Sequence, residues 1–192
     1  MTMLRPAGAL VLVCAGVLLA GPAAVRAVGP QSVTGLTHAP LLARAYDMVY
    51  DADFAGAESE LRRACGPAPA QSCAVIGVAA QWWQIYFDID NRSLDQPFTS
   101  RLDRVIAAGE QWVSREPGCA EAWFYLGAAY GVRVQFHGQR LEFLAAARDG
   151  KRIKQSMEKA LALDPGLDDA NAGLGLYQYY ADVAPSVLKV LR

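Results

Sequence analysis

The chain has only two histidines among its 192 residues, and neither has a recognisable catalytic partner. His38 and His137 are far apart in the sequence, and no acid or nucleophile stands at a recognisable spacing from either. A serine–histidine–acid triad and a cysteine–histidine pair are therefore unsupported. Cys119 is no candidate nucleophile either, because no motif places a base beside it. We expect a protein that is not an enzyme, with no catalytic residues and no cofactor.

The sequence also lacks a concentrated run of positive charge. Lysine and arginine together number 18 against 19 aspartates and glutamates, which gives a formal net charge of -1. The densest basic stretch is broken by acidic residues, and it comprises Arg133, Arg140, Arg148, Lys151, Arg152 and Lys154. We interpret it as a solvated helix face. The composition gives no electrostatic reason to expect nucleic acid as a partner.

The sequence also lacks a complete calcium-binding loop. The most oxygen-rich stretch contains Asp88, Asp90, Asn91, Ser93 and Asp95. Arg92 stands where the alternating ligands should continue, and no glycine follows at the required turn. Ser93 and Asp95 are more simply explained as helix N-caps. We therefore expect no metal site.

The segment 1–27 has the layout of a secretory signal peptide. Residues 7–20 contain no charge and are rich in leucine, valine, alanine and glycine, and a run of small residues ends at Ala27. This predicts cleavage after Ala27, a linker over 28–38, and export to the periplasm or beyond the cell. Loss of the two arginines in this segment would lower the net charge from -1 to -3. The alternative is an uncleaved membrane anchor, since a span needs about 20 apolar residues.

Three cysteines would remain after cleavage. Cys65 and Cys73 flank a proline-containing turn, so in an oxidising compartment a disulfide between them would staple two helices together. Closing so short a loop should stabilise the fold by about 2–3 kcal/mol. The alternative is a pair of buried thiols that act as small apolar side chains. In either case Cys119 is expected to be free.

Beyond residue 38, apolar residues recur at three- and four-residue spacing almost everywhere, and no segment alternates with period two for long. This periodicity predicts an all-α protein. Helices are expected over about 39–50, 55–64, 72–87, 98–115, 120–134, 140–163, 168–181 and from 186 on, with breaks at proline and glycine.

The prolines that close the second helix of each expected pair, Pro69, Pro117 and Pro165, are evenly spaced. The sequence around the last two also agrees, because Glu116-Pro117-Gly118 matches Asp164-Pro165-Gly166, and Leu126-Gly127 falls on Leu174-Gly175 at the same interval. A fixed spacing, here about 48 residues, is typical of a repeat array.

Trp123, Leu126-Gly127 and Tyr130 resemble the first-helix pattern of the tetratricopeptide repeat family at the family's own spacing. Met157, Ala160-Leu161 and Asp164-Pro165 are similar to its second helix. The resemblance covers roughly residues 39–185. It implies an α-solenoid of antiparallel helix pairs over a domain of residues 39–192, in which the glycine lets helices approach closely.

The chain departs from this family in the length of its repeat. The family repeat is about 34 residues long, so each interval between the three prolines is about 14 residues longer. Trp82 and Val105 are separated by the same number of positions as Tyr130 and Ile153, which places the extra residues between the two helices of a pair. Either the helices are lengthened or the turn between them is elaborated.

Adjacent aromatic residues cannot all point into the core, because neighbours on a helix are separated by about 100°. If Trp82 and Trp123 pack between helices, then Trp83 and Phe124 face the concave side, where tetratricopeptide proteins bind extended partner segments. The candidate partner-binding residues are Trp83, Phe124, Tyr179, Tyr180, Glu121 and Asp169, with the two acids at the rim. The alternative is that these aromatics seal one repeat against the next.

The last residues form an apolar pattern with little polar cover. Val187, Leu188, Val190 and Leu191 recur at the spacing of a buried helix face, whereas a terminal repeat normally carries a polar outer face. In this register the last repeat is incomplete. We expect self-association through this helix, or its coverage by downstream sequence, a membrane or a protein partner.

We therefore expect an exported, non-enzymatic scaffold that holds a protein or peptide partner on the concave face of a helical-repeat solenoid. The alternative is a structural subunit of an envelope assembly that docks through its open repeat end. An enzyme is the least supported class, because no nucleophile, base or metal set is found.

The signal-peptide interpretation predicts the N-terminus of the exported protein. N-terminal sequencing of the envelope form should begin near Val28, because the small-residue exit ends at Ala27. Recovery of a membrane-embedded form that retains Met1 would contradict cleavage and support the anchor.

Overall fold

The computed structural model describes residues 35–183 of the chain. These residues form seven α-helices and no strand, which confirms the all-α class expected from the periodicity. The expected signal peptide over 1–27, most of the linker expected over 28–38, and the apolar helix expected from 186 lie outside the described residues. No described helix combines the length and the apolar character that a membrane span needs.

The helices are α1 (Ala39–Tyr50), α2 (Phe54–Ala64), α3 (Ala70–Phe87), α4 (Asp95–Arg115), α5 (Ala120–Gln139), α6 (Phe143–Leu163) and α7 (Asp168–Val183). These bounds agree with the expected ranges to within a few residues. The four helices α3 to α6 are 18 to 21 residues long. The extra residues of each interval therefore lie mainly in longer helices. The connection between α5 and α6 is short (140–142), whereas the one between α3 and α4 is longer (88–94).

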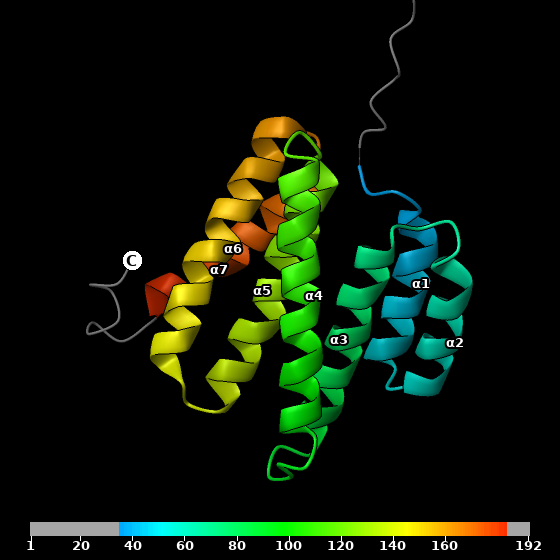
Figure 1. Ribbon diagram of the computed structural model, residues 1–192. Coiled ribbons are helices and arrows are strands. Elements are labelled where there is room, and N and C mark those ends of the chain that lie inside the picture. Colours follow the sequence, from blue (N-terminus) through cyan, green and yellow to red (C-terminus); the bar gives the residue numbers. More distant parts are fainter. Residues whose placement is uncertain (1–34, 184–192) are drawn as a thin grey trace, which may run out of the picture. The chain divides into compact units, whose positions relative to one another are not determined.

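Successive helices lie side by side along the chain (Figure 1), and each contacts the next. Three further contacts skip one helix: α1 packs on α3, α3 on α5, and α5 on α7. As a result α3 and α5 are covered from several directions, and α3 buries Ser72, Trp82, Ile85 and seven other residues. The Phe98 ring of α4 lies against the Phe136 ring of α5, with centroids 4.9 Å apart, and joins the two helices in one core.

Helices α1 and α5 end in the same way. Ala52 and Leu141 have φ angles of 59° and 60°, in the left-handed region. After each of them the chain folds back, with the Asp53 N–H donating to the Met48 carbonyl at 2.9 Å and the Glu142 N–H donating to that of His137 at 2.8 Å. This is the Schellman arrangement, which usually places glycine at the left-handed position. Because neither position holds glycine, composition gave no sign of it.

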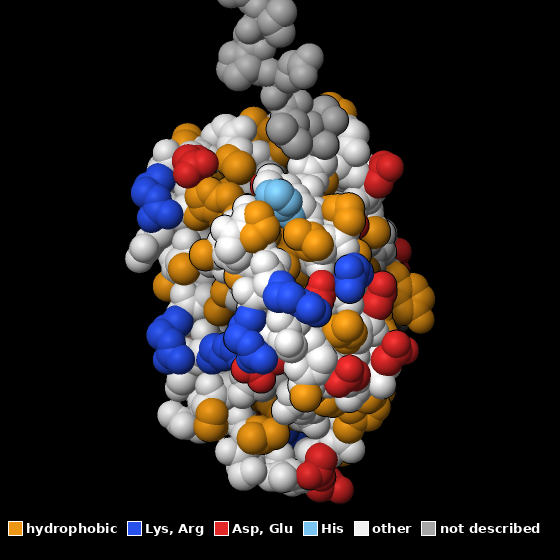
Figure 2. Space-filling model, turned by 90° about the vertical axis from the view of Figure 1, so that its right-hand side faces the viewer, with side chains coloured by type: hydrophobic (Ala, Val, Ile, Leu, Met, Phe, Trp, Pro, Cys, Tyr) orange, Lys and Arg blue, Asp and Glu red, His pale blue; other side chains and the backbone are white. Residues whose placement is uncertain are grey.

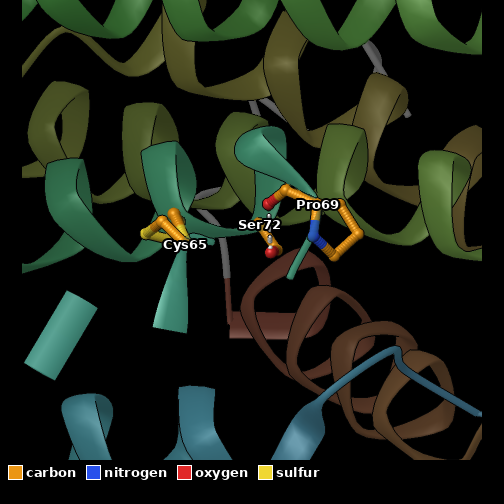
Figure 3. The surroundings of a disulfide bond; sticks show 4 residues. Cys65, Pro69 and Ser72 are labelled. Atoms are coloured by element: carbon orange, nitrogen blue, oxygen red, sulfur yellow. Dashed lines mark hydrogen bonds between the residues drawn. A yellow bond between two sulfur atoms is a disulfide. The ribbon is translucent and has the colours of Figure 1, made fainter. Parts of the chain in front are cut away.

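The disulfide suggested by the sequence is formed in the structure. The sulfur atoms of Cys65 and Cys73 are bonded, with Cα atoms 5.9 Å apart, and they join the end of α2 to the first turn of α3. Figure 3 shows the turn between them, where the Ser72 hydroxyl donates to the Pro69 carbonyl at 2.6 Å. Cys119 is free and half-buried.

One methionine fills the closest approach between α5, α6 and α7. A Cβ placed on Gly127 of α5 would lie 2.9 Å from the Met157 methyl carbon and 3.1 Å from Cβ of Ser156, both on α6. A Cβ on Gly173 of α7 would lie 3.0 Å from the same methyl carbon. Both glycines therefore make room for one side chain.

This contact predicts that Gly127→Leu overpacks the α5–α6 interface. We expect a loss of about 1–3 kcal/mol in the free energy of unfolding, because extra methylenes in a filled core force side chains and backbone to shift. Thermal and urea unfolding would measure it. Gly131→Leu is the matched control, since nothing lies within 4 Å of a Cβ at Gly131 on the same helix. Equal stability of the two variants would contradict the assigned packing.

Candidate functional site

Aromatic side chains form a connected cluster where α1, α2 and α3 meet. The ring centroids of Tyr46 and Tyr50 are 5.0 Å apart, those of Tyr50 and Trp83 are 5.8 Å apart, and those of Trp83 and Tyr86 are 5.5 Å apart. Phe87 continues the chain of contacts, 6.0 Å from Trp83. Most of these pairs are edge-to-face, the arrangement that the ring quadrupoles favour.

Part of this cluster is open to solvent. Tyr50 and Phe87 are each 61% exposed and Tyr86 is 50% exposed. Phe54 is half-buried, and its ring lies 6.2 Å from that of Phe87. We call Tyr50, Phe54, Trp83, Tyr86 and Phe87 the aromatic surface. Figure 2 shows one face of the molecule, on which hydrophobic side chains lie among acidic and basic ones.

Helical periodicity explains how these rings come together. Tyr46 and Tyr50 are one turn apart on α1, as are Trp83 and Phe87 on α3, so each pair lies along one side of its helix. Burial in this position raises the pKa of Tyr46 to about 12, with a further contribution from the neighbouring Tyr50 hydroxyl. The cluster is therefore half-buried at Tyr46 and exposed to solvent at Tyr50, Tyr86 and Phe87.

The two adjacent tryptophans contact each other, with centroids 4.8 Å apart, and have different further neighbours. Trp82 is buried, and its indole N–H donates to the Gln139 side-chain oxygen of α5 at 2.9 Å. Trp83 is half-buried and contacts Tyr50 of α1. The Tyr86 ring lies 5.5 Å from both indoles, so it sits between the sides of α3 that face α1 and α5.

The other predicted partner-binding aromatics lie on different helices. Phe124 of α5 is half-buried and packs 5.1 Å from the Tyr125 ring. Tyr179 and Tyr180 of α7 are 62% and 54% exposed, with centroids 5.4 Å apart. Among the ring contacts of residues 35–183, none connects Phe124 or the α7 tyrosines to the aromatic surface. Only Trp83 of the predicted set belongs to it.

Sequence reasoning missed Tyr50, Tyr86 and Phe87, although helical spacing from Tyr46 and Trp83 could have found them.

Glu121, one of the two predicted rim acids, binds the chain itself. Its carboxylate accepts hydrogen bonds from the Thr37 N–H at 2.9 Å and the Thr37 hydroxyl at 2.7 Å. The Gly35 N–H donates to the Asp164 carboxylate at 3.0 Å. The segment before α1 is therefore held against the start of α5 and the turn before α7.

The second predicted rim acid, Asp169, is exposed on α7. Burial raises the pKa of the Tyr125 hydroxyl, and the negative charges of Glu121 and Asp169 add to this effect. The two acids thus act on one tyrosine, although they belong to α5 and α7.

The interpretation of the basic stretch as a solvated face is wrong for two of its arginines. The Arg133 guanidinium donates to both carboxylate oxygens of buried Asp149, at 2.7 and 2.8 Å. These bonds raise the pKa of Arg133. The Arg140 side chain is only 2% exposed and makes the same two-bond pair with Asp95, at 2.9 and 2.6 Å. Arg133 and Arg140 are thus partly or fully shielded from solvent by ion pairs with acids on other helices. A local sequence pattern does not reveal such pairs.

Arg140 also holds the turn that follows α3. It donates to the Ile89 carbonyl at 2.8 Å while it binds Asp95 in the first turn of α4. Asp95 had been expected to be an N-cap, but α4 begins after Leu94 and the carboxylate binds arginine instead. The end of α3, which carries Tyr86 and Phe87, is thereby tied to the end of α5.

A cleft of about 400 Å³ lies between α4, α5 and α6. His137 borders it and its side chain is 18% exposed, with Nδ1 2.5 Å from a Glu142 oxygen and Nε2 3.6 Å from Asp149. Arg133 and Asp149 neutralise each other in the lining, and Arg148 and Arg152 stand with Asp103 beside them. The cleft therefore presents no marked charge of one sign.

Within residues 35–183, no group of three or more histidine, cysteine, aspartate or glutamate side chains is arranged to hold a metal ion. No protein-family model matches the chain, and comparison with curated proteins and with solved structures finds no significant match.

The contacts of Glu121 predict a local effect of its substitution. Glu121→Gln should raise the amide exchange rate of Thr37 by roughly tenfold, because hydrogen bonds to a charged acceptor contribute about 1.5–3 kcal/mol. Exchange in α3 should stay unchanged. Asp169→Asn is the matched control, since no hydrogen bond to its carboxylate is seen in the described residues. Unaltered protection of Thr37 would show that this contact does not hold the segment.

Proposed function

We propose that this protein is a non-enzymatic repeat scaffold that holds an extended segment of a partner protein against the inner layer of its helices. The observation that carries the proposal is the aromatic surface, in which Tyr50, Tyr86 and Phe87 are half or more exposed and each packs against the Trp83 ring. Exposed contiguous apolar area of this kind is typical of interaction sites.

The pattern of helix contacts supports a solenoid for this role. Helices α1, α3, α5 and α7 contact one another in series, whereas α2, α4 and α6 make no comparable contacts among themselves in residues 35–183. This pattern supports an arrangement in two layers, an inner one of odd-numbered helices and an outer one of even-numbered helices. This is the arrangement implied by the tetratricopeptide resemblance, and stacked helix pairs of this type offer a long inner surface.

The residue types of the aromatic surface suit a peptide partner. Tyrosine and tryptophan provide large contact areas at a low cost in conformational entropy, and they dominate the binding energy of many interfaces. Hydrogen bonds behind the surface reduce the entropic cost of binding further. The Trp82 indole N–H donates to Gln139, and Arg140 donates to the turn after α3. A surface that is already ordered loses less freedom when a partner binds.

We further propose that the protein acts outside the cytoplasm, in the periplasm or after secretion. The Cys65–Cys73 bond supports this location, because disulfides persist in oxidising compartments and are rare in the cytosol. The N-terminal segment with signal-peptide composition supports it independently.

A second candidate function is assembly through α7. Leu176, Tyr179 and Tyr180 are all more than half exposed on this helix, which favours docking of another subunit or of a further helix. The two candidates differ in stoichiometry. Capture of peptides by a folded monomer supports the scaffold, and an obligate oligomer that depends on α7 supports the assembly subunit.

Selection from a random peptide library displayed on phage tests the scaffold. We expect the full chain to select peptides that bind with micromolar affinity, as measured by fluorescence anisotropy of labelled synthetic copies. The double variant Tyr50→Ser with Tyr86→Ser should weaken binding by at least about tenfold, because buried aromatic anchors commonly contribute about 2 kcal/mol or more.

The matched control is Phe143→Ser, which removes a 47% exposed aromatic side chain from α6 in the outer layer. It should leave peptide affinity unchanged. Circular dichroism and melting temperature of all variants would exclude unfolding as the cause. Peptide binding that Phe143→Ser abolishes and the tyrosine double variant spares would refute the assigned surface.

A further inference from the structure

We infer that the segment held by the aromatic surface is cationic, with a lysine or arginine side chain seated on the exposed rings. This inference rests on the proposed function and adds the chemistry of the partner. It follows from the charges around the rings, from the helix ends beside them, and from the way the chain uses its own arginines elsewhere.

Positive charge is missing from the stretches that build this surface. No lysine or arginine occurs between residues 45 and 61 or between residues 64 and 91, which include the second half of α1, most of α2 and all of α3. The same stretches contain four exposed aspartates near the ends of α1 and α3, namely Asp47, Asp51, Asp88 and Asp90. No ion pair to any of these four is present among the described residues.

Five arginines that flank these stretches in the sequence or hold the turn after α3 are paired with other acids, whereas Arg101 of α4 binds Gln81 in the middle of α3. Arg44 and Arg63 both pair with the buried Glu60 carboxylate of α2. Arg62 pairs with Glu58 one turn away. Beyond the end of α3, Arg92 and Arg140 both pair with Asp95 in the first turn of α4. Asp88 accepts a hydrogen bond from the neutral Asn91 side chain at 3.1 Å, and none of the four aspartates is paired with a cationic side chain in the described residues.

The backbone of α1 and α3 adds to the negative electrostatic potential around the rings. Helices α1 and α3 end at Tyr50 and Phe87, so both C-termini reach the aromatic surface, and Asp51 and Asp88 follow directly as C-caps. The C-terminus of a helix carries a partial negative charge, which favours cations within its last turn. No basic residue occupies the last turn of either helix.

The rings offer a second attraction that depends on positive charge. A guanidinium or ammonium group within about 6 Å of a tyrosine or tryptophan face is attracted to the ring quadrupole. The protein already uses this contact on α5, where the Arg133 and Arg152 guanidinium carbons lie 5.1 and 5.5 Å from the centroid of Tyr130. In the described residues no arginine takes such a position over Tyr50, Trp83 or Tyr86.

A membrane surface is the less favoured occupant. Exposed aromatic residues bind bilayers, but anionic headgroups attract basic side chains and would be repelled by the four aspartates. A basic and apolar peptide satisfies both the rings and the acids. Such segments are also common at exposed sites of proteins that bind anionic lipid or nucleic acid.

Matched synthetic peptides test the inference on the full chain. One short fluorescent peptide alternates lysine and leucine, a second carries glutamine in place of lysine, and a third carries glutamate. We expect the lysine peptide to bind roughly tenfold more tightly than the glutamine peptide, and the glutamate peptide to bind most weakly. The advantage of the lysine peptide should shrink in high salt, because exposed charges are screened.

Two sets of variants locate the effect. The triple variant Asp47→Asn, Asp51→Asn and Asp90→Asn should remove most of the preference for lysine and leave the glutamine peptide unaffected. The control triple variant Glu116→Gln, Asp168→Asn and Asp169→Asn changes the net charge equally on exposed residues elsewhere and should keep the preference. Tyr86→Ser should weaken the lysine peptide about two- to fivefold.

The outcomes separate this inference from the proposed function. Equal binding of the lysine and glutamine peptides, still weakened by Tyr86→Ser, would overturn the cationic partner and leave the scaffold standing. An equal loss of preference in both triple variants would also overturn it, because general attraction to an acidic chain would then explain the binding. Vesicles of anionic lipid that bind more tightly than the lysine peptide would do the same. If no peptide binds in a Tyr86-dependent way, the proposed function itself fails.

Discussion

The fold depends on the burial of two helices, α3 and α5, on more than one side. Each contacts four other helices, and α3 contains no lysine, arginine, aspartate or glutamate over its 18 residues. Such a helix is unstable in water unless neighbours cover it, because the hydrophobic contribution grows with the apolar area removed from solvent. The remaining helices can be amphipathic because each covers only part of α3 or α5. The end of α3 is the exception, because no helix within residues 35–183 covers Tyr86 and Phe87, and this end forms the candidate site.

The periodicity of apolar residues predicted the all-α class and all seven described helices, because long amphipathic segments carry the strongest local signal. The turns were harder to predict. Ala52 and Leu141 adopt left-handed conformations that usually belong to glycine, and the energy that holds them comes from the closing hydrogen bonds and the packing of the paired helices. Asp95 looked like a helix cap in isolation, and only the approach of Arg140 from α5 assigns it to an ion pair. These interactions join residues far apart in sequence, so they have no local pattern.

The candidate site was predicted less completely than the fold, and for a related reason. Trp82 is buried and Trp83 is half-buried, but the exposure of the neighbouring rings depends on which adjacent helix ends first. Because α1 stops at Tyr50 and α2 begins only at Phe54, the rings of Tyr50 and Phe87 stay open. Glu121 was expected to face a partner and is instead engaged by Thr37. A carboxylate near a helix N-terminus attracts any donor within reach, and the sequence did not show that the chain's own segment would supply one.

The shared contact of Gly127 and Gly173 with Met157 has a consequence for how this sequence can change over time. The methyl group of one side chain sets the spacing on both sides of α6. A larger residue at either glycine displaces the Met157 side chain, and at Gly127 it also meets Ser156, whereas a smaller residue at position 157 leaves space beside both glycines. The effects of changes at these three positions should therefore not add independently. The residue present at any one of these three positions therefore limits the side-chain sizes that the other two positions can accept.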